Sequence, residues 1–390
     1  MTSSEWMRRA GLATLAGLTL AGAPATAGTF VYVSSALDGE IDTYSMDPSS
    51  GALEPIGKVA AGKVVMPMAV APDKRHLYAA VRSEPYRVLT YAIDPTAGTL
   101  KQAAEAPLPD SMPTIYTDRK GRFLFTASYG GDKIAVNPIG PSGLVTEPAQ
   151  QVIPTGRNDH TIQTDRTNRY AFATNLGSDQ ILQFRFDEAT GRLTPNDPPA
   201  FKTRKDHGPR HLVFSPDNRF VYVLHELSGY VAQLALDADK GTLSEIASVP
   251  SVPAESGLEP GVAQAPITAT MMASGPQNAA PSEKPRIWAA DIQMTPDGRF
   301  LFTTERTSSK IALFSLASES GTPTYVTNIA TETQPRGIKI DPAGRFLVAT
   351  GEKSDRVAVY RIDRESGRLT EAGRYPVGRG ANWVEIVDLP

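Results

Sequence analysis

The fold is decided by the stretch Pro296-Asp-Gly-Arg299-Phe-Leu-Phe302, which joins a turn, an arginine and an apolar run. Variants of this stretch recur along the chain, and each carries one marker arginine: Arg75, Arg122, Arg169, Arg219, Arg299 and Arg345. The spacings between successive marker arginines are 47, 47, 50, 80 and 46 residues. Such regular self-similarity indicates a repeat architecture rather than several unrelated domains.

A second mark is an aspartate four residues before a Gly-x-Leu triplet. It recurs at Asp47, Asp94, Asp187, Asp237 and Asp363. Turns of this kind join alternating runs as hairpins do, so each repeat is expected to hold four short strands. In the repeat around Arg299, the first strand covers residues 290–294 and the second covers residues 300–304. Four strands at this period predict one blade of a β-propeller.

Six marker arginines predict six blades, and the two chain ends together predict a seventh. The run Phe30-Val-Tyr-Val33 begins three strands of that blade, and Asn382-Trp-Val-Glu-Ile-Val387 supplies its first strand. Pairing of the two termini closes the ring and leaves few free strand edges. The predicted fold class is therefore all-β, a seven-bladed β-propeller formed by residues 28–390 as a single domain.

The composition agrees with this fold and excludes several function classes. Among 390 residues, 32 are glycine and 32 are proline, as many short strands and chain reversals require. The formal net charge of −3 argues against a nucleic-acid binder, whose phosphate contacts need a basic surplus. The absence of cysteine excludes disulfide scaffolds, cysteine–zinc sites and thiol nucleophiles.

The N-terminus has the parts of a secretory signal. Arg8-Arg9 precede an apolar run over residues 10–23, and Ala25-Thr-Ala27 follows with small residues. The run is too short for a membrane-spanning helix of about 20 residues. We therefore predict that residues 1–27 are removed by cleavage after Ala27, which leaves a periplasmic or secreted protein without a membrane anchor. A disordered or helical N-terminus that stays attached is the alternative, and Sec and twin-arginine export both remain open.

One spacing between marker arginines is 80 residues instead of the usual 47. The excess falls in residues 249–286, a segment rich in proline, alanine, glycine and serine. This segment holds too little apolar material for a second core. It is therefore predicted to be an exposed and mobile inserted loop.

Two positions of every blade are expected to meet at one mouth of the central channel. They are the start of the first strand, nine residues before the marker arginine, and the end of the second strand, seven residues after it. The first set is Met66, Pro113, His160, Arg210, Ala290 and Arg336, and the second is Arg82, Tyr129, Leu176, Glu226, Arg306 and Glu352. Charges gathered around one channel are costly unless they are paired or bound to a ligand. The pattern favours an anion-binding site with a base, and a solvated rim of salt bridges is the alternative.

The other histidines are not expected to bind metal. His76 and His225 lie in second strands, where packing is the simpler role. His207 and His211 flank Gly208-Pro209, and this proline forbids the helix that would bring the two rings together. We therefore predict no metal site and no cofactor.

Four segments carry a resemblance to a known family. They are Gly208-Pro-Arg-His-Leu-Val-Phe214 with His225-Glu-Leu-Ser228, Trp288-Ala-Ala-Asp-Ile292, Thr331-Glu-Thr-Gln-Pro-Arg-Gly337 and Gly373-Arg-Tyr-Pro-Val-Gly378. In them the chain closely resembles the seven-bladed β-propeller lactonase family, over nearly all of residues 28–390 outside the insertion. The resemblance implies a 6-phosphogluconolactonase-like hydrolase. The substrate is expected to be 6-phosphogluconolactone or, for an exported protein, an unphosphorylated gluconolactone-type lactone.

By the same resemblance, the catalytic residues fall on four of the counted mouth positions, His160, Arg210, Glu226 and Arg306. Glu226 or His160 is expected to deprotonate water, while the two arginines hold the oxyanion. Further residues are expected to bind the substrate, namely Arg336, Arg82, Asp291 and His211.

Two other functions remain open at this point. A carboxymuconate-type cycloisomerase, which forms lactones from unsaturated diacids, could use the same residues. A non-catalytic exported binding propeller is also possible, because one fold hosts many functions. In each case the expected partner is a small molecule and the expected state is a monomer.

Overall fold

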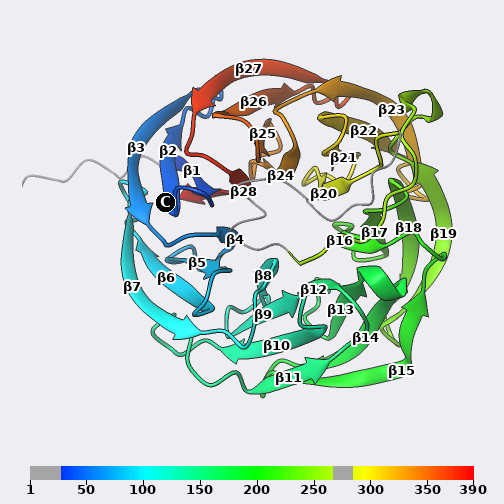
Figure 1. Cartoon of the computed structure of the whole chain (residues 1–390), viewed down its shortest axis with the longest axis horizontal. Helices are drawn as coiled ribbons and strands as arrows, with labels where there is room; N and C mark the ends of the chain where they lie inside the picture. Colours follow the sequence, from blue (N-terminus) through cyan, green and yellow to red (C-terminus); the bar gives the residue numbers. More distant parts are fainter. Residues whose placement is uncertain (1–27, 267–283) are drawn as a thin grey trace, which may run out of the picture.

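The computed structural model describes residues 28–266 and 284–390, and it arranges them as a ring of seven sheets (Figure 1). Each sheet has four antiparallel strands. The described residues contain no α-helix, only the 3₁₀-helices η1 (Leu176–Ser178) and η2 (Ala254–Ser256). The prediction of an all-β, seven-bladed propeller is therefore confirmed. No helix in the described part of the chain is long and apolar enough to cross a membrane.

Six blades are continuous in sequence, and the first strand of each lies nearest the channel (Figure 1). Blade 1 contains β4 (Val65–Val70), β5 (His76–Val81), β6 (Arg87–Ile93) and β7 (Leu100–Pro107). Blade 2 contains β8 (Thr114–Thr117), β9 (Phe123–Ser128), β10 (Lys133–Pro138) and β11 (Gln151–Pro154). Blade 3 contains β12 (Asp159–Thr164), β13 (Tyr170–Asn175), β14 (Gln180–Asp187) and β15 (Arg192–Lys202).

The other three continuous blades follow the same pattern. Blade 4 contains β16 (Pro209–Phe214), β17 (Phe220–His225), β18 (Tyr230–Asp237) and β19 (Thr242–Pro250). Blade 5 contains β20 (Ala289–Met294), β21 (Phe300–Glu305), β22 (Lys310–Leu316) and β23 (Pro323–Ala330). Blade 6 contains β24 (Pro335–Ile340), β25 (Phe346–Gly351), β26 (Arg356–Ile362) and β27 (Leu369–Pro376).

Blade 7 is built from both chain ends. Its strands are β28 (Ala381–Leu389), β1 (Gly28–Ser35), β2 (Glu40–Met46) and β3 (Leu53–Ala60). β28 pairs antiparallel with β1, with Phe30 opposite Val387 and Gly28 opposite Leu389. The predicted closure of the ring by the terminal strands is thus confirmed. The predicted signal segment, residues 1–27, lies outside the described residues.

Adjacent blades pack together where the aromatic residue after a marker arginine contacts the glycine of a turn in the neighbouring blade. Tyr170 follows a marker arginine in blade 3, and Gly241 belongs to a Gly-x-Leu turn in blade 4. A Cβ at Gly241 would overlap the Tyr170 ring, and its φ of +69° already favours glycine. The same contact between a glycine and an aromatic ring recurs at other interfaces: Gly98 with Phe30, Gly191 with Phe123, Gly321 with Phe220, Gly367 with Phe300 and Gly51 with Phe346.

The marker arginines stabilise the turns that carry them. Nε of Arg219 donates to Asp217 (2.6 Å), and its guanidinium lies 4.9 Å from the centroid of the Phe220 ring. Its Nη2 donates to the carbonyl of Glu319 in blade 5 (2.8 Å). The ion pair is solvent-exposed, so it contributes at most about 1 kcal/mol. Repetition of this arrangement indicates a structural role.

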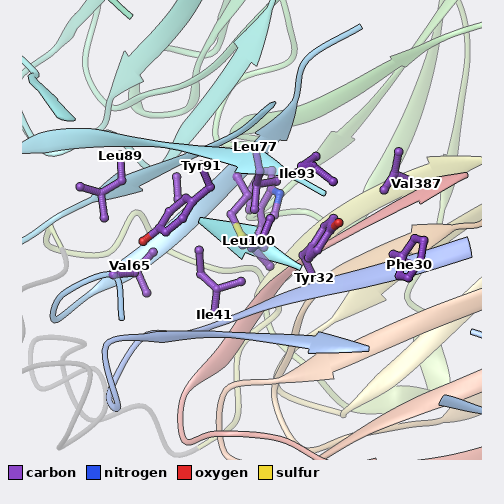
Figure 2. Close-up of a cluster of buried hydrophobic side chains, with 14 of the residues drawn as sticks. Phe30, Tyr32, Ile41, Val65, Leu77, Leu89, Tyr91, Ile93, Leu100 and Val387 are labelled. Carbon is purple, nitrogen blue, oxygen red and sulfur yellow. The ribbon is translucent and has the colours of Figure 1, made fainter. Parts of the chain in front are cut away.

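The hydrophobic core is divided into clusters between neighbouring blades. Figure 2 shows the cluster between blades 7 and 1, where Tyr32 and Ile41 meet Leu77 and Tyr91. Tyr32 is fully buried, and its hydroxyl donates to the carbonyl of Gly98 (2.9 Å). Burial of each such side chain stabilises the fold by about 1.5–3 kcal/mol. The first strands are thereby held firmly around the channel, which fixes the residues at its mouth.

The insertion begins slightly later than predicted, because β19 continues to Pro250 as a regular strand. Glu259 and Arg286 form a parallel bridge at its base. Its middle, residues 267–283, lies outside the described residues, so the predicted mobility stays a prediction. The described part is not wholly exposed, since Gln264 and Ala265 are half-buried.

Candidate active site

Seven of the twelve counted positions line one cavity at the mouth of the channel: Arg82, Pro113, Tyr129, His160, Glu226, Arg306 and Arg336. They come from six blades, so no single blade forms this site. Trp288, Gln264 and Ala265 complete the cavity wall. The counted positions therefore share one end of the ring, as the repeat predicted.

A β-bulge interrupts the start of the first strand in five blades. In blade 4 the register shifts between Pro209 and Leu212, which brackets Arg210. In blade 3 the shift lies between Asp159 and Thr161 and brackets His160. Equivalent shifts occur in β4, β20 and β24. Bulges redirect side chains out of the regular pleat. Of the residues that these shifts bracket, His160 and Arg336 line the cavity, whereas Arg210 does not.

Glu226 is held between two arginines. Nε of Arg210 donates to Oε2 of Glu226 (2.7 Å), and Nη2 of Arg306 donates to the same oxygen (2.8 Å). All three side chains are buried. Breaking such a buried pair costs about 3–5 kcal/mol, because one charge is left uncompensated. Glu226 also lines the cavity, so this carboxylate both fixes the arginines and faces the ligand space.

Arg210 is the most deeply buried member of this group, with 0% of its surface exposed. It is not part of the cavity lining itself. Its Nη1 donates to the carbonyl of Ala290, whereas its Nη2 has no hydrogen-bond partner among the described residues. Burial, reinforced by Arg306 and Arg336, lowers the pKa of Arg210 to about 9, so the group stays charged at neutral pH. A buried cationic donor without a partner is costly, so Arg210 is held in place chiefly by its bonds to Glu226 and Ala290.

Arg306 lies over the indole ring of Trp288, a residue to which the sequence assigned no role in the site. Its Cζ is 3.7 Å from the ring centroid of Trp288. Its Nε and Nη2 also donate to the carbonyls of Trp288 and Ala289, both at 3.1 Å. A desolvated cation–π contact of this kind stabilises by about 2 kcal/mol. The sequence offered one signal for this contact: Trp288 stands two residues before Ala290, which is one of the counted positions.

His160 faces the same cavity as a neutral imidazole. Burial, and then the charge of Arg210, lowers its pKa well below 6.5. Its Nδ1 has no hydrogen-bond partner within residues 28–266 and 284–390. The rings of Tyr129 and His211 lie edge-on, with centroids 6.0 and 5.0 Å away. A neutral imidazole with a free nitrogen can accept a proton from a ligand.

Arg82 and Arg336 bring further positive charge to the cavity. Nε of Arg82 donates to Oγ of Ser111 (3.0 Å), and burial, followed by the charge of Arg336, lowers the pKa of Arg82 to about 9. Nε of Arg336 lies 3.8 Å from Oε1 of Glu352, which is too far for a hydrogen bond. Among the twelve counted positions, four arginines stand against two glutamates. This surplus favours an anionic ligand.

His211 and Asp291 line a second cavity, of about 350 Å³, and not the one that holds Glu226 and His160. Nδ1 of His211 lies 2.8 Å from Oδ1 of Asp291, and its Nε2 lies 3.2 Å from Nη1 of Arg210. Burial, and then the charge of Arg210, lowers the pKa of His211 to about 4. The neutral ring therefore donates from Nδ1 to Asp291 and accepts from Arg210 at Nε2. This geometry argues against the direct substrate contact predicted for His211 and Asp291.

The insertion supplies Gln264 and Ala265 to the cavity wall. The hydroxyl of Tyr129 donates to the carbonyl of Gln264 (2.9 Å). The backbone N–H of Gly261 donates to the carbonyl of Leu227 (2.7 Å). Sequence reasoning missed these residues, because the insertion has no repeat register from which their place could be counted.

The cavity combines a carboxylate, a neutral imidazole and several guanidinium groups. The first two can take a proton from water, and guanidinium groups can stabilise an oxyanion. No group of three His, Asp or Glu residues in the described part of the chain could hold a metal ion. The arrangement suits a carbonyl group that gains negative charge as it reacts.

Sequence comparisons agree with this geometry. The family model for lactonase, 7-bladed beta-propeller, matches residues 30–386. A Serratia proteamaculans protein named 6-phosphogluconolactonase is 38% identical over 357 residues, which cover 92% of this chain and 98% of the relative. A Pectobacterium carotovorum protein of the same name is 37% identical over 359 residues, with 92% and 98% covered.

Comparison with solved structures also finds a protein named as a lactonase. The Pseudomonas aeruginosa protein named periplasmic gluconolactonase is similar with a TM-score of 0.79 at 26% identity, covering 94% of this chain and 100% of that one. The family model spans almost the whole of the described ring, including both terminal strands. The chain therefore belongs to the seven-bladed β-propeller lactonase family.

Proposed function

We propose that this protein hydrolyses a sugar-acid lactone. The observation that carries the proposal is the position of Glu226 between Arg210 and Arg306, beside the neutral ring of His160. The relatives named 6-phosphogluconolactonase and the structure named periplasmic gluconolactonase support the same reaction class. Because one fold hosts many functions, this group of residues is a stronger argument than the ring itself.

Lactone opening requires a proton to leave water, a carbonyl oxygen to carry negative charge, and the ring oxygen to gain a proton. We assign the proton transfers to His160, because Oε2 of Glu226 already accepts from two guanidinium groups, whereas Nδ1 of His160 has no hydrogen-bond partner among the described residues. As water attacks the carbonyl carbon, its proton passes to His160. The bond to the ring oxygen then breaks, and His160 returns the proton to that oxygen. The product is an open-chain sugar acid.

Arg306, which lines the cavity, is assigned to the oxyanion in this proposal. Arg210 does not line the cavity and is assigned to hold Glu226 through its Nε. Each oxyanion donor lowers the barrier by about 3–4 kcal/mol. His211 and Asp291 bond to Arg210 from the second cavity, so they are assigned the positioning of Arg210 instead of substrate contact.

Arg82 and Arg336 are assigned to an anionic substituent of the substrate, which a 6-phosphate would provide. An exported enzyme would instead meet the unphosphorylated gluconolactone. The two substrates are separated by comparing kcat/KM for each lactone in the wild-type and Arg82→Ala proteins. If Arg82 binds the phosphate, Arg82→Ala should lower kcat/KM for the phosphorylated lactone and leave kcat/KM for the unphosphorylated lactone nearly unchanged. Equal effects on both lactones would favour the unphosphorylated substrate.

We also propose export of a monomeric mature protein to the periplasm or the medium. β1 is paired with β28 from Gly28 onward, so the proposed mature chain contains the whole of this described strand pair. The test is the intact mass of the protein recovered from the periplasm or medium. A mature chain that begins at Gly28 supports the proposal, and an exported chain that retains Met1 contradicts the cleavage.

The activity is tested by titration of the acid released at constant pH, since every opened lactone yields a carboxylic acid. Spontaneous opening is subtracted in a sample without enzyme. The proposal predicts a clear acceleration above this background. A folded protein that instead forms a lactone from an unsaturated diacid would favour the carboxymuconate-type cycloisomerase, and binding without turnover would favour a binding propeller.

A further inference from the structure

The cavity at the channel mouth is smaller than the substrate proposed for it. Its volume is about 30 Å³, the space of roughly one or two water molecules. A sugar-acid lactone is several times larger. A lactone bound here would therefore either extend out of the mouth or displace part of the wall.

Most of the wall is fixed by the blades. Glu226 and Arg306 are buried and bonded to each other, and Trp288 packs against the guanidinium of Arg306. His160 lies within β12. Of the residues that line the cavity, Gln264 and Ala265 are the ones that lie outside the blades and their short connecting loops. The insertion is therefore the part of the wall that can move without disturbing the ring.

The segment 261–266, which we name the strap, is lightly attached. At one end the N–H of Gly261 donates to the carbonyl of Leu227, and further along Tyr129 donates to the carbonyl of Gln264. The amide of Gln264 donates back to the carbonyl of Val262, inside the strap itself (2.9 Å). Val262 is 39% exposed. Apart from the approach of Pro266 to Gly130, the bonds to Leu227 and Tyr129 are the contacts that hold the strap to the described blades, which makes the strap the least firmly attached part of the described wall.

We propose that Gln264 and Ala265 determine the size of the substrate. The strap swings outward to admit a lactone of a single sugar and then forms the outer wall against it, so that a lactone carrying a second sugar is excluded. The small side chain of Ala265 leaves the space that the single sugar occupies. This inference rests on the proposed lactonase function and adds the size class of its substrate.

The test uses the full chain and two lactones, glucono-δ-lactone and the disaccharide lactone lactobiono-δ-lactone. A Gln264→Gly/Ala265→Gly double variant is expected to raise the ratio of kcat/KM for the disaccharide to that for the single sugar by at least about tenfold. The single variant Ala265→Trp is expected to lower kcat/KM for the single-sugar lactone by at least about tenfold, chiefly through KM.

Val262→Ala is the matched control, because Val262 lies in the same strap, is exposed and does not line the cavity. It should leave both kcat/KM values within about twofold of wild type. If the glycine variant keeps the wild-type ratio of the two kcat/KM values and the tryptophan variant keeps the wild-type KM, the strap does not contact the substrate and the inference is overturned. In that case, turnover of the single-sugar lactone by the wild-type protein still supports the proposed function. If the wild-type protein opens no lactone, both are overturned.

Discussion

Arg210 and Glu226 form a buried ion pair in blade 4, with Nε of Arg210 lying 2.7 Å from Oε2 of Glu226. Both residues are counted from the same marker, Arg219: one stands nine residues before it and the other seven residues after it. The turn that builds the blade therefore also sets the distance between these two charges. The repeat that forms the scaffold and the residues that form the site are parts of one pattern.

The first prediction concerns Arg210. Replacement by alanine releases one of the two arginine partners of the buried Glu226, so kcat/KM for lactone opening should fall by about 100-fold or more. The matched control is Arg219→Ala in the same blade, which removes an exposed pair with Asp217, the contact with the Phe220 ring and a hydrogen bond to the carbonyl of Glu319, all away from the cavity. The control should keep activity within about threefold of wild type. Similar losses in both proteins would contradict the assignment of Arg210.

The second prediction concerns the pH dependence that His160 imposes. Its pKa is lowered by burial and by Arg210, so the ring stays neutral as the pH falls through 6.5. The value of kcat/KM should therefore remain flat around pH 6.5 and decline only in more acidic solution, as His160 becomes protonated. His160→Gln should lower kcat by a factor of about 100 or more.

The measurement for His160 is a pH–rate profile of both proteins, corrected for spontaneous opening. An acid limb centred at pH 6.5 in the wild-type protein would contradict the lowered pKa. A His160→Gln protein that keeps both its rate and the wild-type acid limb would identify Glu226 as the base instead.

The third prediction separates positioning from binding at Asp291. Asp291→Asn keeps the shape of the side chain but weakens its hold on His211, and through His211 on Arg210. We expect kcat to fall by roughly tenfold, equivalent to about 1.4 kcal/mol, with KM little changed. Steady-state kinetics check this directly. A rise in KM at unchanged kcat would instead support the direct contact between Asp291 and the substrate that the sequence predicted.

The fourth prediction concerns the contact between Gly241 and Tyr170. Gly241→Ala places a Cβ where the Tyr170 ring lies, so the blade 3–blade 4 interface should lose about 1–3 kcal/mol through overpacking, in addition to backbone strain. Gly257→Ala is the control, since Gly257 has a similar φ of +70° and no atom of the described residues would lie within 4 Å of its added Cβ. Thermal unfolding of both variants measures the difference. Equal midpoints would show that the ring of Tyr170 moves aside freely.

The sequence was sufficient to predict the ring and seven residues that line the cavity at its mouth, because a fixed register turns residue counting into geometry. The register alone could not predict where His211 and Asp291 point. Each stands one residue past a counted position, inside a β-bulge that interrupts the regular alternation of side chains.

Other parts of the site could not be predicted by counting. Gln264 and Ala265 lie in an insertion without a repeat, and their place depends on tertiary contacts with Tyr129 and Leu227. The register also does not predict how deeply a side chain is buried. It placed Arg210 at the mouth of the channel but could not show that Arg210 is absent from the cavity lining. Depth is decided by the bulge and by the bonds that the long side chain makes after folding.

Glu226→Gln tests the central claim most directly. The variant keeps the shape of the side chain and removes the charge that holds Arg210 and Arg306, and its circular dichroism spectrum establishes whether the ring is retained. With glucono-δ-lactone at constant pH, the account predicts acceleration by the wild-type protein and a loss of about 100-fold or more in the folded variant. A folded Glu226→Gln protein that opens the lactone as fast as wild type would contradict the account.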